Sequence, residues 1–91
     1  MRITQKDLEQ KATLLNEITG SPITGWTRSD GKNTANIGHY YISYAYGGVN
    51  LNRHVNLGGG ANEPLSFGHV PKRELYRMLC AFIAGIEQVT A

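Results

Sequence analysis

Histidines, a single cysteine and a short basic run are the residues of this chain whose types could do chemistry. His39 and His54 fall in segments rich in aromatic and β-branched residues, whereas Cys80 lies in an apolar run. Two histidines with no neighbouring cysteine or carboxylate make an incomplete ligand set, because zinc sites use three or four protein ligands. A thiol within an apolar run is usually buried and inert. We therefore expect no metal, no cofactor and no catalytic cysteine.

The serines and glycines indicate no enzyme either. Ser43 would lie near His54 only diagonally across the expected strands, and Ser66 is close to His69 only along the sequence. A nucleophile needs a base within hydrogen-bond reach, which neither spacing guarantees. The glycines at 58–60 are followed by Ala-Asn-Glu-Pro rather than by the Lys-Ser/Thr of a P-loop. We expect a protein that is not an enzyme.

Lys72, Arg73 and Arg77 form the strongest electrostatic feature of the sequence. They stand at the start of an expected helix, where cations oppose the helix dipole and do not stabilise the helix locally. Arg73 and Arg77 are one turn apart on one face. The three side chains either form a solvated face, paired with Glu74, or contact an anionic partner.

Length and charge limit the partners. Ninety-one residues make one small domain, 1–91, and nine Lys and Arg against seven Asp and Glu leave a net charge of +2. That charge is too small for the long-range positive field of a dedicated nucleic-acid binder. No run of eighteen apolar residues occurs, and charges occupy the N-terminal stretch where a signal peptide is apolar. With one cysteine, the chain is expected to be cytoplasmic, with no membrane association.

The elements that position these groups follow an α-β-β-β-α order. Apolar residues recur at helical spacing over 4–19 and again over 71–88, with Thr4 and Asp7 as capping residues of the first helix. Segments 23–28, 39–46 and 49–56 have strand composition, and 29–36 is expected to be a polar loop with a turn at Asp30-Gly31. A short strand around 65–67 is left open. The fold class is α+β: a three-stranded, or with that segment four-stranded, antiparallel sheet with both helices on one face.

A hairpin turning at Gly47-Gly48 would set the strand register. With Tyr46 opposite Val49, one face of the sheet is apolar, and the other carries His39, Tyr41 and His54 among Asn and Ser residues. The apolar face and the helical stripes then form one core. Its expected members are Leu8, Leu15, Ile18, Ile42, Tyr44, Leu51, Leu75, Leu79 and Phe82. The polar face of the first helix, which includes Asn16, is expected to be solvated.

Two resemblances accompany this pattern. The α-β-β-β-α order, with Gly38-His39 before a strand and Lys72, Arg73 and Arg77 at the last helix, resembles the double-stranded-RNA-binding domain, although the Lys-Lys-x-Ala-Lys run of that family is missing. The strings GWTR, GKNTANIGHYYISYAYGGVNL and VPKRELYRMLCAFIAGI look like those of small uncharacterised proteins of tailed bacteriophages and bacterial prophages. The second resemblance implies an accessory protein of the host-cell cytoplasm and supplies no catalytic residue.

These observations favour a non-catalytic binding module. Its polar sheet face, with His39, Tyr41 and His54, is rich in hydrogen-bonding groups, and the last helix carries a stripe of small residues, Ala81, Ala84 and Gly85. That stripe would allow close approach of a second copy or a protein partner, or it would accommodate the first helix within one monomer. The alternative function is nucleic-acid binding through Lys72, Arg73 and Arg77.

Overall fold

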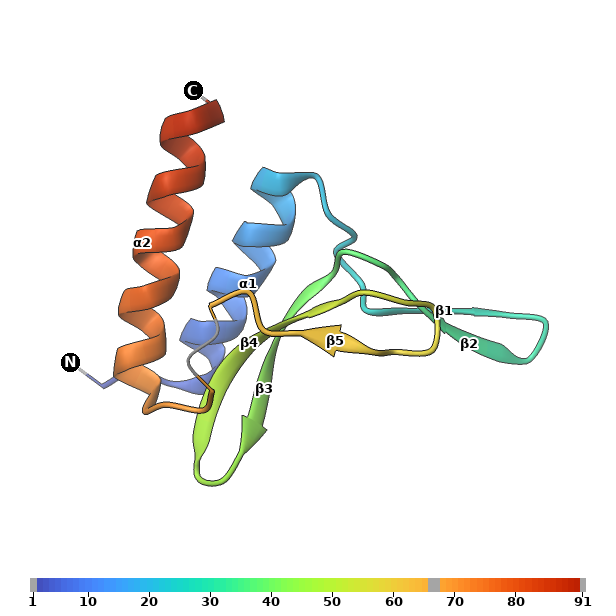
Figure 1. Ribbon diagram of the computed structural model, residues 1–91, viewed down its shortest axis with the longest axis horizontal. Coiled ribbons are helices and arrows are strands. Elements are labelled where there is room, and N and C mark those ends of the chain that lie inside the picture. Colours follow the sequence, from blue (N-terminus) through green and yellow to red (C-terminus); the bar gives the residue numbers. More distant parts are fainter. Residues whose placement is uncertain (1, 66–67, 91) are drawn as a thin grey trace.

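The computed structural model describes residues 2–65 and 68–90 and confirms the α+β class (Figure 1). The element order is α1 (Gln5–Thr19), β1 (Trp26–Ser29), β2 (Lys32–Ala35), β3 (Tyr40–Ala45), β4 (Gly48–His54), β5 (Ala61–Asn62) and α2 (Lys72–Thr90). The strands do not form the single sheet expected from the sequence. They are split into a β1-β2 pair and a three-stranded sheet of order β3-β4-β5.

Helix α1 begins and ends where its sequence signals predict. Thr4 caps the helix, since its hydroxyl accepts from the Asp7 amide while its own amide donates to the Asp7 carboxylate at 2.9 Å. These hydrogen bonds hold the pKa of Asp7 below its usual range. Gly20 ends the helix in the left-handed conformation, at φ 68°.

The β3–β4 hairpin turns one residue earlier than expected. Tyr46 and Gly47 form the turn, both at positive φ, and Ala45 pairs with Gly48. The predicted pairing of Tyr46 with Val49 is therefore wrong. Because the turn moves by one residue on both strands, each partner shifts by two, and a shift of two keeps every side chain on its predicted face.

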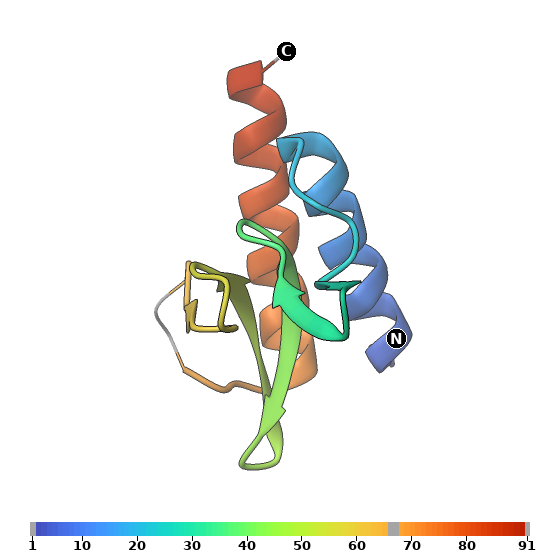
Figure 2. The same cartoon turned by 90° about the vertical axis from the view of Figure 1, so that its right-hand side faces the viewer.

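Both helices cover the apolar face of this hairpin, as predicted. They lie side by side and run in the same direction (Figures 1 and 2). Tyr44 is 42% exposed, and Ile18 and Phe82 are half-buried rather than central. The buried core consists of Ile3, Leu8, Ala12, Leu15, Tyr40, Ile42, Val49, Leu51, Leu75, Leu79 and Ile83.

Residues 26–35 form a hairpin arm where a strand and a polar loop were expected. Asp30 and Gly31 make its turn, as predicted, but residues 32–35 return as β2. The arm projects away from the helices (Figure 1), and β1 is exposed along its whole length. Its mostly polar side chains explain why no second strand was expected here, since strand prediction depends on one apolar face.

Strand β5 and the bridge of Val49 to Val70 close the far edge of the sheet. The strand left open around 65–67 falls largely on residues outside the described part of the chain. In the described segments, neither helix has the length of apolar sequence needed to cross a bilayer.

Candidate functional site

The polar face of the sheet is largely covered, which corrects the expectation of an open binding surface. Asn50 is 1% and His54 5% exposed. The segment leading to α2 covers one part of this face, where Asn50 donates to the Glu63 carboxylate at 2.7 Å. The base of the arm covers the other part, where Trp26 packs edge-on against the His54 ring.

Four aromatic rings gather where the arm meets the hairpin. His39 and His54 stack with centroids 5.8 Å apart, and Tyr41 lies 4.8 Å from His54 and 6.0 Å from His39. Trp26 completes the cluster at 5.3 Å from His54. The structure thus brings together the three residues of the predicted sheet-face site and adds Trp26, which the sequence did not point to.

The two imidazoles differ in their surroundings. Nδ1 of His39 lies 2.8 Å from the Pro22 carbonyl, which can only accept, so Nδ1 donates this hydrogen bond. Nδ1 of His54 is buried without a hydrogen-bond partner among the described residues. Burial, and then the charge of His39, lower the pKa of His54. His54 is therefore held neutral near pH 7.

Ser43 and His69 form a pair that the sequence had not linked. Ser43 Oγ lies 3.2 Å from Nε2 of His69, the spacing of a nucleophile and its base. Nδ1 of His69 has no hydrogen-bond partner within the described ranges, so the third, orienting group of such a site is missing there. Ser66, the other serine considered, lies outside the described residues. The pair alone does not make an active site.

The remaining chemical candidates stay apart. Cys80 is a partly buried free thiol on α2. Within residues 2–65 and 68–90, no three His, Cys, Asp or Glu side chains come close enough together to hold a metal ion.

Asn16 is the polar residue whose role the sequence analysis missed. It is 1% exposed, not solvated as expected. Its side-chain amide donates to the Tyr40 carbonyl at 3.0 Å and accepts from the Tyr40 amide at 2.8 Å. Asn16 stands four residues after Ala12 and eight after Leu8, so its place on the buried stripe was visible in the spacing.

The basic residues of α2 lie beside those of α1. Lys72, Arg73 and Arg77 are all exposed. Because the helices run in the same direction, their N-terminal ends meet: Ile3 shares a hollow with Arg73 and Arg77, and Gln5 shares another with Lys72. Residues 2–11 and 72–77 together hold six of the nine cations and three of the seven acids. The positive charge is thus concentrated at one end of the helix pair.

The C-terminal half of α2 presents an apolar groove. Its lining alternates small and large side chains, and every lining residue is exposed or half-buried. A Cβ at Gly85 would meet nothing within 4 Å. The groove residues are Ala81, Phe82, Gly85, Ile86 and Val89.

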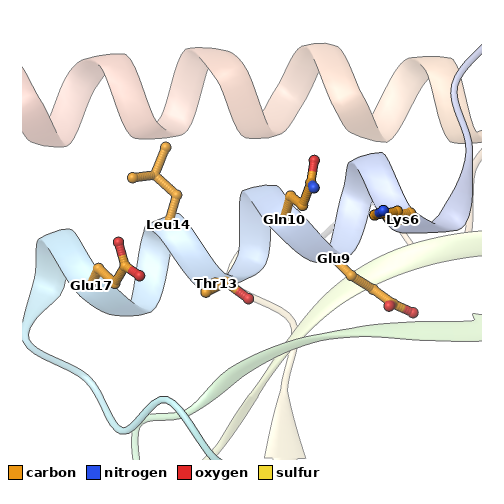
Figure 3. Close-up of a pocket in the computed structure, with 6 residues that line it drawn as sticks. All are labelled: Lys6, Glu9, Gln10, Thr13, Leu14 and Glu17. Carbon is orange, nitrogen blue, oxygen red and sulfur yellow. The ribbon is translucent and has the colours of Figure 1, made fainter.

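A second hollow lies on the outer face of α1 (Figure 3). All its lining side chains come from this one helix, and the figure shows Leu14 pointing toward α2 while Glu9 points toward the strands. Glu9 accepts a hydrogen bond from the Tyr44 hydroxyl at 3.0 Å. Burial and this bond raise the pKa of Tyr44 to about 12. The side chains diverge and do not converge on a ligand.

Comparison with known proteins gives no family for this chain. No family model, no curated protein and no solved structure matches it.

Proposed function

We propose that this protein is a non-catalytic binding module that self-associates through the groove on α2. The observation that carries the proposal is that two of the three small residues, Ala81 and Gly85, are exposed and line the groove, whereas Ala84 is exposed outside it. The small stripe had two explanations, and packing of α1 in one monomer would require it to be covered. An exposed stripe beside large apolar side chains instead suits a helix from outside the monomer.

The groove is complementary to itself. If two α2 helices cross antiparallel about a two-fold axis between residues 82 and 85, Phe82 lies opposite Gly85 of the other copy, and Ala81 lies opposite Ile86. Each large side chain then meets a small one, so the backbones can approach closely.

The expected dimer is weak. A few turns of one helix bury less than the ~1,200–2,000 Å² of a stable interface. Self-association should therefore depend on concentration and should be resolved by sedimentation velocity across the micromolar to millimolar range.

Gly85→Leu tests the groove directly. The monomer has room for the side chain, and leucine is a better helix former than glycine, so the monomer should gain stability. The dimer should be lost, because the introduced leucine side chain and Phe82 of the other copy would occupy the same space. Ala84→Leu is the matched control, since Ala84 is exposed on the same helix but does not line the groove. A monomeric wild type at millimolar concentration, or a Gly85→Leu protein that dimerises like the wild type, would refute the proposal.

A second candidate function is nucleic-acid binding at the basic end of the helix pair. It is favoured by the hollows that Ile3 shares with Arg73 and Arg77 and that Gln5 shares with Lys72, because the N-terminal segment that reaches this end also carries Arg2 and Lys6. Six cations against three acids still make a modest site, which is why this function is placed second.

Salt dependence separates the two functions. If the cluster binds phosphates, replacing Lys72, Arg73 and Arg77 by Gln should weaken binding to duplex RNA or DNA and lower the salt slope by about one for each phosphate that is no longer neutralised. Arg28→Gln with Lys32→Gln, on the arm, is the matched control. Anisotropy that shows no binding near 150 mM salt would exclude this candidate. The phage or prophage origin and the cytoplasmic location stay predictions.

A further inference from the structure

We propose that His39 and His54 form an acid-sensitive latch that holds the β1–β2 arm against the β3–β4 hairpin. The two residues lie directly opposite each other at the end of the β3–β4 ladder, where the His54 amide donates to the His39 carbonyl at 3.0 Å. Their rings stack at 5.8 Å with an interplanar angle of 25°. The pair is thus fixed by the backbone of the core hairpin.

The segment that enters the arm rests on these two rings. A Cβ at Gly25 would lie 3.2 Å from Nε2 of His39 and 3.6 Å from Nε2 of His54, so both ring edges occupy the space beside Gly25 and leave no room for a larger residue. The Pro22 carbonyl accepts a hydrogen bond from Nδ1 of His39, and Trp26 packs on His54. Three residues of the segment 22–26 therefore pack against the two rings.

Protonation works against this arrangement. The two rings contact the Tyr41 and Trp26 rings and the side chain of Asn16, none of which carries a negative charge that would balance a proton. Arg53, the charged neighbour on β4, is itself a cation and donates to the Gly38 carbonyl at 3.3 Å. Burial and the charge of His39 lower the pKa of His54, and a second proton on the stack would add like-charge repulsion.

The sign of the pH effect follows from this. A freed His54 takes up its proton near its ordinary pKa of 6.5, whereas the latched ring takes it up only at lower pH. Above about pH 6.5, protonation of His54 does not favour opening of the latch. Below that pH the opening equilibrium rises, in total by about tenfold for each unit by which the pKa of the latched His54 lies below that of the freed ring.

The rest of the arm offers little to oppose opening. β1 is exposed throughout, and β2 buries only Ala35. The Ala35 amide donates to the Leu57 carbonyl at 3.0 Å, which links the arm to the loop after β4. A two-stranded hairpin with both faces in water is marginal alone, so the arm should open as a unit while the helices stay folded.

Amide hydrogen exchange from pH 8 to 4.5, corrected for intrinsic rates, tests the latch. Exchange at Ala35 should accelerate severalfold as pH falls from about 6.5 to 4.5, with α1 and β3–β4 still protected. Trp26, the sole tryptophan, should become more accessible to acrylamide over the same range. His54→Phe keeps an aromatic ring that cannot be protonated and should abolish the acceleration. His69→Phe is the matched control and should retain it.

Three results would overturn the proposal: no acceleration at Ala35, acceleration that survives His54→Phe, or simultaneous loss of protection in the arm and helices. If the His54→Phe protein does not fold, an NMR titration of the imidazole resonances of the wild type tests the latch instead. The His54 titration must then lie below its ordinary pKa of 6.5 and coincide with arm opening, and a titration at or above 6.5, or one separate from arm opening, refutes the latch.

Discussion

Asn16→Ala is the substitution for which the structure predicts the clearest loss of stability. The Asn16 side chain on α1 is hydrogen-bonded to β3, which lies at the edge of its sheet. Both hydrogen bonds go to the backbone of one residue, with the Tyr40 amide at 2.8 Å and its carbonyl at 3.0 Å. Alanine would leave these two backbone groups buried without a partner.

The magnitude follows from those two groups. A buried donor or acceptor left unpaired costs about 1–3 kcal/mol, so the two together should cost about 2–6 kcal/mol. The free energy of unfolding of a small domain is about 5–15 kcal/mol in total. Urea denaturation followed by circular dichroism should therefore show a much lower midpoint with a similar slope. Glu17→Ala, at the exposed neighbouring position, should change the unfolding free energy by less than about 0.5 kcal/mol.

Asn16→Asp separates hydrogen bonding from packing, because the two side chains have the same shape. The ionised carboxylate introduced by this substitution would accept from the Tyr40 amide but repel the Tyr40 carbonyl. Burial would raise the folded-state pKa of the new carboxyl above its unfolded value, so the protonated acid, which can donate, contributes stability at low pH that is lost as pH rises. The loss of unfolding free energy of the Asn16→Asp protein relative to wild type should become smaller toward pH 4. A deficit independent of pH, or an Asn16→Ala loss below about 0.5 kcal/mol, would refute the reasoning.

Two further substitutions test the hairpin turn and the core. Tyr46→Asn should raise the unfolding free energy by up to about 1 kcal/mol, because Tyr46 sits at φ 55° in a turn that favours Asn-Gly; a loss of stability would show that its contact with His69 matters more. Leu79→Ala should cost about 2–5 kcal/mol, since Leu79 is fully buried between the helices and sheet; an unchanged thermal midpoint would contradict its central place.

Local patterns predicted the helices and the faces of the hairpin. The spacing of Leu8, Ala12 and Leu15 marks the buried side of α1, and Thr4 with Asp7 marks its start. Such signals operate within one or two turns of chain, where the sequence itself supplies all the partners. The faces of β3 and β4 were predicted correctly despite a misplaced turn because strand side chains alternate with a period of two.

The tertiary structure alone decided the features that depend on distant partners. The side chain of Asn16 is buried because Tyr40, 24 residues away, offers two unpaired backbone groups. The two histidine rings are covered because residues 22–26 fold back over them, and burial lowers the pKa of His54. The groove on α2 is open because α1 packs elsewhere. Periodicity specifies which side of an element is apolar, but not which other element will cover it, because that choice is made by contacts between segments far apart in the chain.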